Sequence, residues 1–387
     1  MKKTLIRITT VPMAFKVLLK DQIKFMVKNG FDVIMVGADG KERSDVINNE
    51  GARYVIVPMT RKITPFADLI CLIKLIRVMK KYHPAIVHSH TPKAGLLGMI
   101  AARISGVKIR IHTVAGLTLM AEKGLKKNIL LQTERITYSC ATNVWPNSFS
   151  LYKYIQKHKL ASPKKLKVIA NGSTNGINFE TYSRNNLDKN KIEVLKKSLP
   201  FESKLLLLFV GRIVRDKGIE ELISVFRIMQ KKFPIQLILI GPFEDNLDPI
   251  AGITKKEIIE NPNITQINWS DDVPYYMAIS DILIHPSHRE GFPNVILQAG
   301  ALELPIVCSN IDGNIDIVTS SEMGYVFKVK DEKSLTKYLT NCISNKEERI
   351  SKAKTLHDKI VELYNQKFVQ QEILKNYNSL LALHDRK

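Results

Sequence analysis

Short apolar runs alternate with amphipathic segments of helix length along the chain, and the alternation restarts near the middle. The runs have the length of buried strands, and the segments between them are long enough to cross a sheet. This alternation predicts parallel sheets covered by helices, and so an α/β fold. Strands are predicted at residues 5–9, 32–37, 54–59, 85–90, 108–113, 142–147 and 165–170, then at 205–210, 235–240, 263–267, 281–285, 305–308 and 324–327.

A polar, turn-rich stretch from Asn171 to Asn178 separates the two alternations and is interpreted as a linker. The chain has 387 residues, which is too long for one typical domain and suits two. The tail over residues 360–383 has the pattern of a single long helix. We therefore expect two α/β domains followed by a C-terminal helix.

Composition limits the cellular context. Apolar residues make up 45% of the chain and charged residues 25%, which is ordinary for a globular protein. The four cysteines are widely spaced, lack the spacing of a zinc site, and are expected to be reduced. The N-terminus lacks the apolar core of a signal peptide, and no apolar run reaches the roughly 18 residues of a membrane span. We expect a cytoplasmic protein.

A turn without apolar periodicity follows the predicted strand at 281–285 and reads Glu-Gly-Phe-Pro at 290–293. A helix is predicted to begin near Pro293, with Gln298 on its second turn. The free N–H groups and positive dipole end of such a helix bind phosphate. Gly291 allows close approach of the backbone, and Glu290 adds a carboxylate acceptor. The pattern predicts a site for a nucleotide sugar.

A second cationic turn follows the predicted strand at 205–210. Arg212 and Lys217 flank it, between that strand and a helix that starts near Ile219. Open α/β sheets bind ligands at the carboxyl ends of their strands, and an Arg fork with a Lys charge suits a diphosphate. The alternative interpretation is that both side chains are solvated loop cations. The nearby Glu-Gly-Phe-Pro turn favours the diphosphate.

These two segments, in this order, resemble the retaining glycosyltransferases of family 4, which have the GT-B fold. The matching pattern is Gly-Arg-x4-Lys-Gly at 211–218, followed by Pro-Ser-x2-Glu-Gly-Phe-Pro at 286–293. One position departs, because Gln298 stands where the family has a second Glu. By resemblance, that residue would bind the ribose hydroxyls, and Gln keeps a carbonyl acceptor there.

The resemblance implies two doubly wound, Rossmann-like domains that face a central cleft. The acceptor-side domain would be residues 1–180, with a C-terminal helix at about 365–387 packing back on it, and the donor domain would be residues 181–364. Trp269 would lie near the nucleobase, with a core tryptophan as the equal alternative. The catalytic residues implied are Arg212, Lys217, Glu290 and His112. The donor-binding residues implied are Gly211, Gly291, Phe292, Pro293, Asn294, Gln298 and Trp269.

Polar clusters also end two predicted strands of the first half. His88 and His90 alternate on one strand and point to the same face, and His112 lies on the next strand. A metal site would need all three, but the chain has no Asp-x-Asp motif and the resemblance implies neither a metal nor a cofactor. Satisfied strand-end histidines are the alternative. The acceptor-side residues expected are Pro12, in an apolar loop over residues 10–16, together with His90 and Lys93.

Charge is divided unevenly. Residues 1–180 carry 30 Lys and Arg against 10 Asp and Glu, a net charge of +20, whereas the rest of the chain carries +1. One-sided basicity indicates an anionic partner. The predicted helix at 65–83 mixes apolar and basic residues, so it could lie on an anionic membrane, although it could equally be a core helix with a basic rim. Nucleic acid is less favoured because no recognised binding motif is present.

The expected function is therefore the transfer of a sugar from a nucleotide sugar, most simply a UDP-sugar, to a lipid-linked saccharide in surface-polysaccharide assembly. Prepositioned cations would stabilise the departing diphosphate without a metal. Peripheral attachment to the cytoplasmic face of the inner membrane would follow. The alternatives are a basic nucleic-acid or anionic-polymer binding protein and a GT-B-like sugar-nucleotide epimerase.

Overall fold

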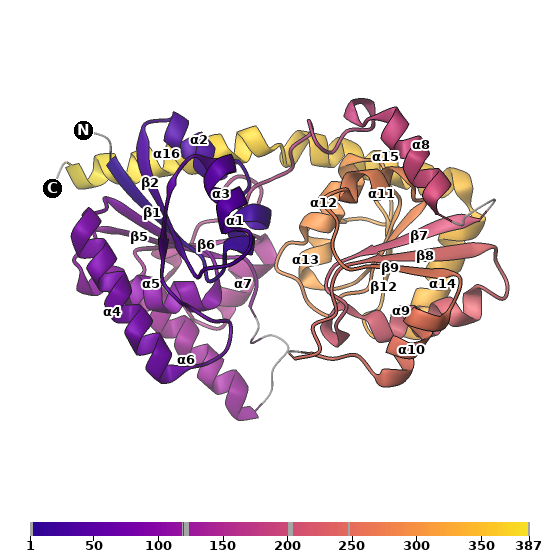
Figure 1. The fold of residues 1–387 in the computed structure, drawn as a ribbon, viewed down its shortest axis with the longest axis horizontal. Helices are drawn as coiled ribbons and strands as arrows, with labels where there is room; N and C mark the ends of the chain where they lie inside the picture. Colours follow the sequence, from indigo (N-terminus) through magenta and orange to yellow (C-terminus); the bar gives the residue numbers. More distant parts are fainter. Residues whose placement is uncertain (1–2, 118, 120–123, 200–203, 247, 386–387) are drawn as a thin grey trace. The chain divides into compact units, whose positions relative to one another are not determined.

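The chain divides between Asn175 and Gly176 in the computed structural model, which describes residues 3–117, 119, 124–199, 204–246 and 248–385 (Figure 1). One unit comprises Met1–Asn175 and Gln366–Lys387, and the other comprises Gly176–Asn365. The division falls inside the predicted linker at 171–178, before the domain limit placed after residue 180.

The first unit is built on a parallel sheet in the order β3-β2-β1-β4-β5-β6. Its strands are β1 (Lys3–Ile8), β2 (Phe31–Gly37), β3 (Arg53–Ile56), β4 (Ile86–Ser89), β5 (Ile109–Val114) and β6 (Asn143–Pro146). The prediction of a seventh strand at 165–170 was wrong. Pro163–Lys165 forms a 3-10 turn, Leu166 makes a single bridge to Val144, and Ala170 adopts a positive φ of 50° that ends any extended run.

Helices cover both faces of this sheet (Figure 1). The helices are α1 (Pro12–Leu18), α2 (Gln22–Lys28), α3 (Arg43–Glu50), α4 (Pro65–Tyr82), α5 (Pro92–Ile104), α6 (Gly124–Cys140), α7 (Phe149–Lys157) and α16 (Gln366–Asp385). Side chains of α4, α5 and α6 share one core cluster, and those of α1, α2 and α16 share the other. The segment predicted as a loop at 10–16 is mostly helix α1, because Pro12 occupies its first turn.

The long C-terminal helix predicted over residues 360–383 is broken. Helix α15 (Lys346–Leu363) ends before Tyr364, and α16 starts at Gln366. The break has a tertiary cause: the Tyr364 carbonyl accepts a hydrogen bond from the Ile177 N–H at 2.8 Å, and Asn365 bridges to Ile177. Helix α16 then packs Val369, Ile373, Tyr377 and Leu381 into the core of the first unit.

The second unit repeats the architecture, with its six parallel strands in the order β12-β11-β10-β7-β8-β9. The strands are β7 (Leu205–Val210), β8 (Ile235–Ile240), β9 (Ile264–Ile267), β10 (Ile282–His285), β11 (Ile306–Ser309) and β12 (Tyr325–Phe327). The helices are α8 (Lys189–Ser198), α9 (Ile219–Met229), α10 (Gly252–Glu260), α11 (Val273–Ile279), α12 (Asn294–Ala301), α13 (Asp312–Ile315), α14 (Glu332–Ser344) and α15. The predicted α/β class is confirmed, and each strand predicted in this half is present.

The strand order creates one special position in each sheet. Both sheets are doubly wound, and the direction of winding reverses between β1 and β4 in the first unit and between β7 and β10 in the second. The loops that leave such a pair diverge to opposite faces and leave a crevice at the carboxyl edge, where open α/β sheets bind ligands. Among the described residues, no helix combines the length and apolarity needed to cross a bilayer.

Candidate active site

The two segments singled out in the second half of the sequence leave neighbouring strands at the winding reversal. Gly211 follows β7, and Pro286 follows β10, which pairs with β7 in parallel. Both loops therefore emerge from the same edge of the sheet. The sequence pattern could not establish this, because the strands are about 75 residues apart and their adjacency depends on the strand order.

Lys217 and Glu290 meet between these loops. The Lys217 ammonium forms an ion pair with Glu290 Oε1, and the two side chains are 18% and 17% exposed. The Ser287 hydroxyl donates to the same oxygen at 3.0 Å, and His285 Nε2 lies 3.3 Å from it. Burial alone would raise the pKa of Glu290, but the Lys217 charge and His285 outweigh burial and hold that pKa well below its usual range. Glu290 is thus a carboxylate at neutral pH.

Arg212 takes a different partner. Its guanidinium forms an ion pair with Glu244 at 2.5 Å, on the loop that follows β8. Glu244 is not among the residues predicted from the sequence, although its place after a predicted strand could have drawn attention to it. The structure therefore brings Lys217 and Glu290 together and places Arg212 one strand away, bound to another carboxylate.

Glycines allow the loops around this pair to touch through their backbones. Gly218 has a φ of +70°, and a Cβ at that position would overlap the carbonyl oxygen of Pro286. A Cβ on Gly241 would overlap the Gly211 carbonyl, and one on Gly313 would lie 2.8 Å from the carbonyl oxygen of Glu290. Larger residues could not occupy these positions without moving a backbone. The close contacts hold the Lys217 and Glu290 loops in a fixed relation.

Ion pairs reinforce the same junction. Arg289 pairs with Asp216 at 2.6 Å, and His288 Nε2 lies 2.8 Å from Glu221 Oε1. The His288 N–H also donates to the Asp216 carbonyl at 2.9 Å. Asp216, His288 and Arg289 occupy spacer positions of the two motifs, whereas Glu221 lies outside them on α9. Together these contacts join the 211–218 loop and the start of α9 to the 286–293 loop.

The helix after the Glu-Gly-Phe-Pro turn begins one residue later than predicted. Pro293 is the N-cap residue of α12, and Asn294 is its first helical residue. Phe292 is buried and packs against Tyr364 with ring centroids 5.4 Å apart, so its ring belongs to the core. Gly291 is buried, whereas Asn294 and Gln298 are half-buried. The donor-binding roles of these residues remain predictions.

Trp269 is not a core residue. It follows β9 with 49% of its surface exposed, and its indole Nε1 donates to Asp271 Oδ1 at 3.4 Å. The alternative of a core tryptophan was therefore wrong. The exposed indole is available for contact with a base, and binding of the nucleobase remains a prediction.

His112 is buried within the first unit, 3% exposed, on β5. Its Nδ1 lies 2.9 Å from the Ser89 hydroxyl, and its ring fills the space where a side chain on Gly95 would lie. Burial lowers the pKa of His112 to about 4, so the imidazole is neutral at physiological pH. The catalytic role that the resemblance implies for His112 remains a prediction.

His88 and His90 belong to a buried polar network around Arg7. Arg7 is fully buried and donates from Nε to His90 Nε2 at 3.0 Å and from Nη1 to the Tyr377 hydroxyl at 3.2 Å. His88 Nδ1 lies 2.5 Å from the same hydroxyl. Burial lowers the pKa values of both histidines well below the usual range, so both are neutral. The network joins α16 to the sheet, and His90 is buried within it. Acceptor binding by His90 remains a prediction.

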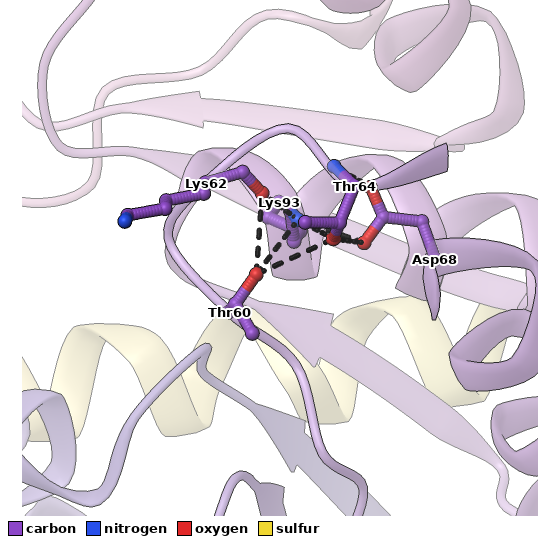
Figure 2. Close-up of polar contacts among 5 residues, drawn as sticks. All are labelled: Thr60, Lys62, Thr64, Asp68 and Lys93. Carbon is purple, nitrogen blue, oxygen red and sulfur yellow. Dashed lines mark hydrogen bonds and ion pairs between the residues drawn. The ribbon is translucent and has the colours of Figure 1, made fainter. Parts of the chain in front are cut away.

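Lys93 is held at the start of α4 (Figure 2). Its ammonium forms an ion pair with Asp68 at 2.7 Å and also donates to the Lys62 carbonyl and to the hydroxyls of Thr60 and Thr64. An ammonium has three N–H groups, so these four acceptors already use its capacity. Pro12 is buried at the start of α1. Acceptor binding by these two residues remains a prediction. Among the described residues, no three His, Cys, Asp or Glu form a group that could hold a metal.

Glu134 of α6 is a buried acid, and Tyr138, whose ring centroid lies 6.0 Å from that of His112, follows it one turn further along the helix. Burial raises the pKa of Glu134 from its ordinary 4.5 to about 7. The folded protein therefore binds more protons than the unfolded chain between these values, so this group costs stability as the pH rises through that window. Above pH 7 the cost to the free energy of unfolding approaches roughly 3 kcal/mol.

Relative to the wild type, Glu134→Gln is expected to stabilise the protein more at pH 8 than at pH 5, because Gln cannot ionise in the buried site. Urea unfolding at both pH values measures the effect, with Glu193→Gln on the exposed surface of α8 as the control. An equal effect of Glu134→Gln at both pH values would show that the carboxyl is not titrating in this range.

Comparison with known proteins agrees with the architecture. The family of glycosyl transferases group 1 matches residues 190–356, and the glycosyl transferase 4-like family matches residues 7–148. The capsular polysaccharide biosynthesis glycosyltransferase CapM of Staphylococcus aureus is 37% identical over 366 residues, which is 94% of this chain and 94% of its own. The UDP-Gal:alpha-D-GlcNAc-diphosphoundecaprenol alpha-1,3-galactosyltransferase of Escherichia coli is 25% identical over 350 residues, covering 89% and 88% of the two chains.

Solved structures share the fold over nearly the whole chain. HepE from Anabaena, in complex with UDP and glucose, has a TM-score of 0.80 at 17% identity and covers 97% of this chain and 100% of its own. Sucrose-phosphate synthase from Thermosynechococcus elongatus has a TM-score of 0.82 at 18% identity, with 98% and 100% covered. With these matches across both units, the chain belongs to the family-4 glycosyltransferases and has the GT-B fold.

Proposed function

We propose that this glycosyltransferase transfers a sugar, with retention of its anomeric configuration, from a UDP-sugar to a lipid-linked saccharide during assembly of a bacterial capsule or related surface polysaccharide. The relatives support the substrate classes: CapM is named for capsular polysaccharide biosynthesis, and the galactosyltransferase is named for UDP-Gal and a diphosphoundecaprenol acceptor. HepE was solved with UDP and glucose. The reaction would take place at the cytoplasmic face of the membrane.

The Lys217–Glu290 pair at the winding reversal is the observation that carries the proposal. It combines a cation suited to a diphosphate with a carboxylate suited to sugar hydroxyls, on loops that leave adjacent strands. The two charges neutralise each other in the structure. When the donor binds, Lys217 exchanges the carboxylate for a phosphate oxygen, and Glu290 turns to the sugar hydroxyls.

The same groups account for catalysis. Cleavage of the sugar–phosphate bond places negative charge on the leaving diphosphate, which Lys217 and Arg212 stabilise from positions set before the reaction. Arg212 first leaves Glu244, which costs little because this pair is partly solvated. Retention follows from attack on the same face, with the acceptor hydroxyl giving its proton to the departing phosphate oxygen. No carboxylate nucleophile and no metal are required.

The reaction is tested with pure protein and a panel of UDP- and GDP-sugars, by measuring nucleotide release with and without a chemically defined lipid-diphosphate sugar. We expect acceptor-dependent release from one UDP-sugar, an α-linked product from an α-linked donor by NMR, and unchanged rates in EDTA. Release only from GDP-sugars would overturn the donor class, an inverted product would overturn retention, and conversion of the donor to an epimer would identify an epimerase.

Lys217→Ala is expected to weaken UDP binding and reduce kcat/KM together, because it removes a charge-assisted contact worth roughly 1.5–3 kcal/mol. Arg212→Ala should act in the same direction. Isothermal titration with UDP and steady-state kinetics measure both effects, and Lys255→Ala is a control because Lys255 also pairs with an acid, Asp245, on the exposed surface of the same unit. Near-normal turnover in both test variants would contradict the diphosphate assignment.

A further inference from the structure

Helix α4 of the first unit has two unlike sides. Cys71, Leu75 and Met79 are buried in the core that α4 shares with α5 and the sheet. On the opposite side, large apolar residues are open to solvent, beginning in the loop before the helix. They are Ile63, Phe66, Leu69, Ile70 and Ile73, of which Ile63 is 71% and Phe66 is 88% exposed. Packing within the unit explains the first set and leaves the second without a partner among the described residues.

The exposed residues lie on one stripe and change character along it. The spacing from Phe66 to Ile73 is i, i+3, i+4, i+7, which brings these side chains onto one helix face. The same stripe continues with exposed basic residues, Lys74, Arg77, Lys80 and Lys81. Its N-terminal half is therefore apolar and its C-terminal half is basic. We call these residues together the α4 stripe.

Asp68, the one acidic residue in the segment around α4, is paired with Lys93 and so adds no net negative charge to the surface. Residues 61–83 contain six Lys and Arg but a single acidic residue, Asp68. The Asp68 carboxylate points inward to Lys93, which also binds the Thr60–Thr64 loop (Figure 2). This arrangement neutralises Asp68 and fixes the loop that carries Ile63 beside the start of the helix. The α4 stripe is held in place and has no acidic side chain of its own.

We propose that the α4 stripe docks the protein on an anionic lipid bilayer, with Phe66 and its apolar neighbours inserted among the acyl chains and the basic half against the headgroup phosphates. Its biological purpose rests on the proposed function, since a lipid-linked acceptor stays in the bilayer and the enzyme has to reach it. The sequence predicted a membrane-binding helix over residues 65–83 as a whole. The structure moves the insertion point to residues 63–73 and assigns Leu75 and Met79 to the core.

Charge favours lipid over other occupants. A second copy of the chain would bring two basic stripes together in a half of the molecule that carries +20, which is unfavourable. A nucleic acid would satisfy the basic half but would leave the exposed Phe66 and Ile70 without an apolar partner. Only an interface that is anionic at its surface and apolar a few ångströms below matches both halves of the stripe.

Co-sedimentation with vesicles tests the docking without donor or acceptor, so failure of the proposed reaction and failure of docking can be distinguished. We expect binding to phosphatidylglycerol vesicles at low salt, weaker binding at high salt, and little binding to phosphatidylcholine. Phe66→Ser with Ile70→Ser should reduce binding at least tenfold through lost apolar burial. Lys80→Gln with Lys81→Gln should reduce it by about fivefold for each charge removed.

The matched control is Ile253→Ser with Ile259→Ser, which changes two exposed apolar residues on α10 of the other unit. This control should bind vesicles like the wild type. Unchanged binding of the Phe66 and Ile70 double variant, or equal loss in the control, would overturn the assignment to α4. Salt-resistant binding to neutral vesicles would overturn the role of the basic half. A concentration-dependent dimer that the Phe66 and Ile70 substitutions abolish, without vesicle binding by the wild type, would identify a second copy as the occupant.

Discussion

Glu290→Gln is expected to lower kcat by about a hundredfold or more while the affinity for UDP stays the same or increases. The carboxylate contacts Lys217 in the structure and, in our proposal, the sugar hydroxyls during the reaction. Gln cannot neutralise Lys217, so the ammonium is freed for phosphate. The loss of the Glu290 charge acts mainly on the transition state. Removal of a contact that is made only in the transition state lowers kcat and kcat/KM equally. Steady-state kinetics and UDP titration measure the two quantities separately.

Gln298→Glu is the matched control, because it changes an amide to an acid at the position where the family has Glu. Gln298 is half-buried on α12, and within the described part of the chain no hydrogen bond or ion pair joins it to the Lys217–Glu290 pair. We expect a change of only a few-fold. A silent Glu290→Gln together with an inactive Gln298→Glu would show that the two roles had been exchanged.

Gly218→Ala is expected to abolish activity and to destabilise the second unit by roughly 3 kcal/mol or more. Gly218 has a left-handed backbone with φ +70°, and an added Cβ would overlap the Pro286 carbonyl. One of the two backbones must move, and the shift separates Lys217 from Glu290. Urea unfolding and turnover measure the two consequences.

Gly106→Ala separates the two causes of that loss. Gly106 has nearly the same φ, +72°, but nothing lies within 4 Å of the added Cβ. The free energy of unfolding of this variant should fall only by the cost of the left-handed conformation, about 1 kcal/mol, and its activity should be unchanged. If Gly218→Ala behaved like Gly106→Ala, the close approach of the two loops would not be needed for the site.

A pH effect accompanies the Glu290 pair. Because the pKa of Glu290 is depressed in the folded protein, the stability it contributes is present above the ordinary carboxyl pKa and is lost as the pH falls through the folded value. Glu134 acts in the opposite direction, since its raised pKa removes stability as the pH rises towards 7. The two acids together favour a stability maximum in the mildly acidic range.

Local pattern determined a large part of this protein. Continuous apolar runs such as Leu205–Val210 form strands because a parallel strand that is buried on both faces carries apolar side chains at nearly every position. The alternation of such runs with helices implied two α/β units. The motif residues Lys217 and Glu290 could be chosen because a cation and an acid in turns without apolar periodicity are not explained by packing. Predictions failed where the run was weakly apolar or interrupted, as at residues 165–170, where Pro163 and the positive φ of Ala170 prevent a strand.

Tertiary structure decided what depends on contacts between distant residues. The order of the strands places β7 beside β10, and only this adjacency joins Lys217 to Glu290 and sends Arg212 to Glu244. The break at Tyr364 comes from pairing with Ile177, far away in the sequence. Which apolar residues of α4 face the core is likewise set by the sheet beneath it, because a helix with apolar residues on two sides can bury either one. Sequence determined the elements and the chemistry of the motifs, whereas the partners of each charged group and the exposed side of each helix came from the packing of the whole unit.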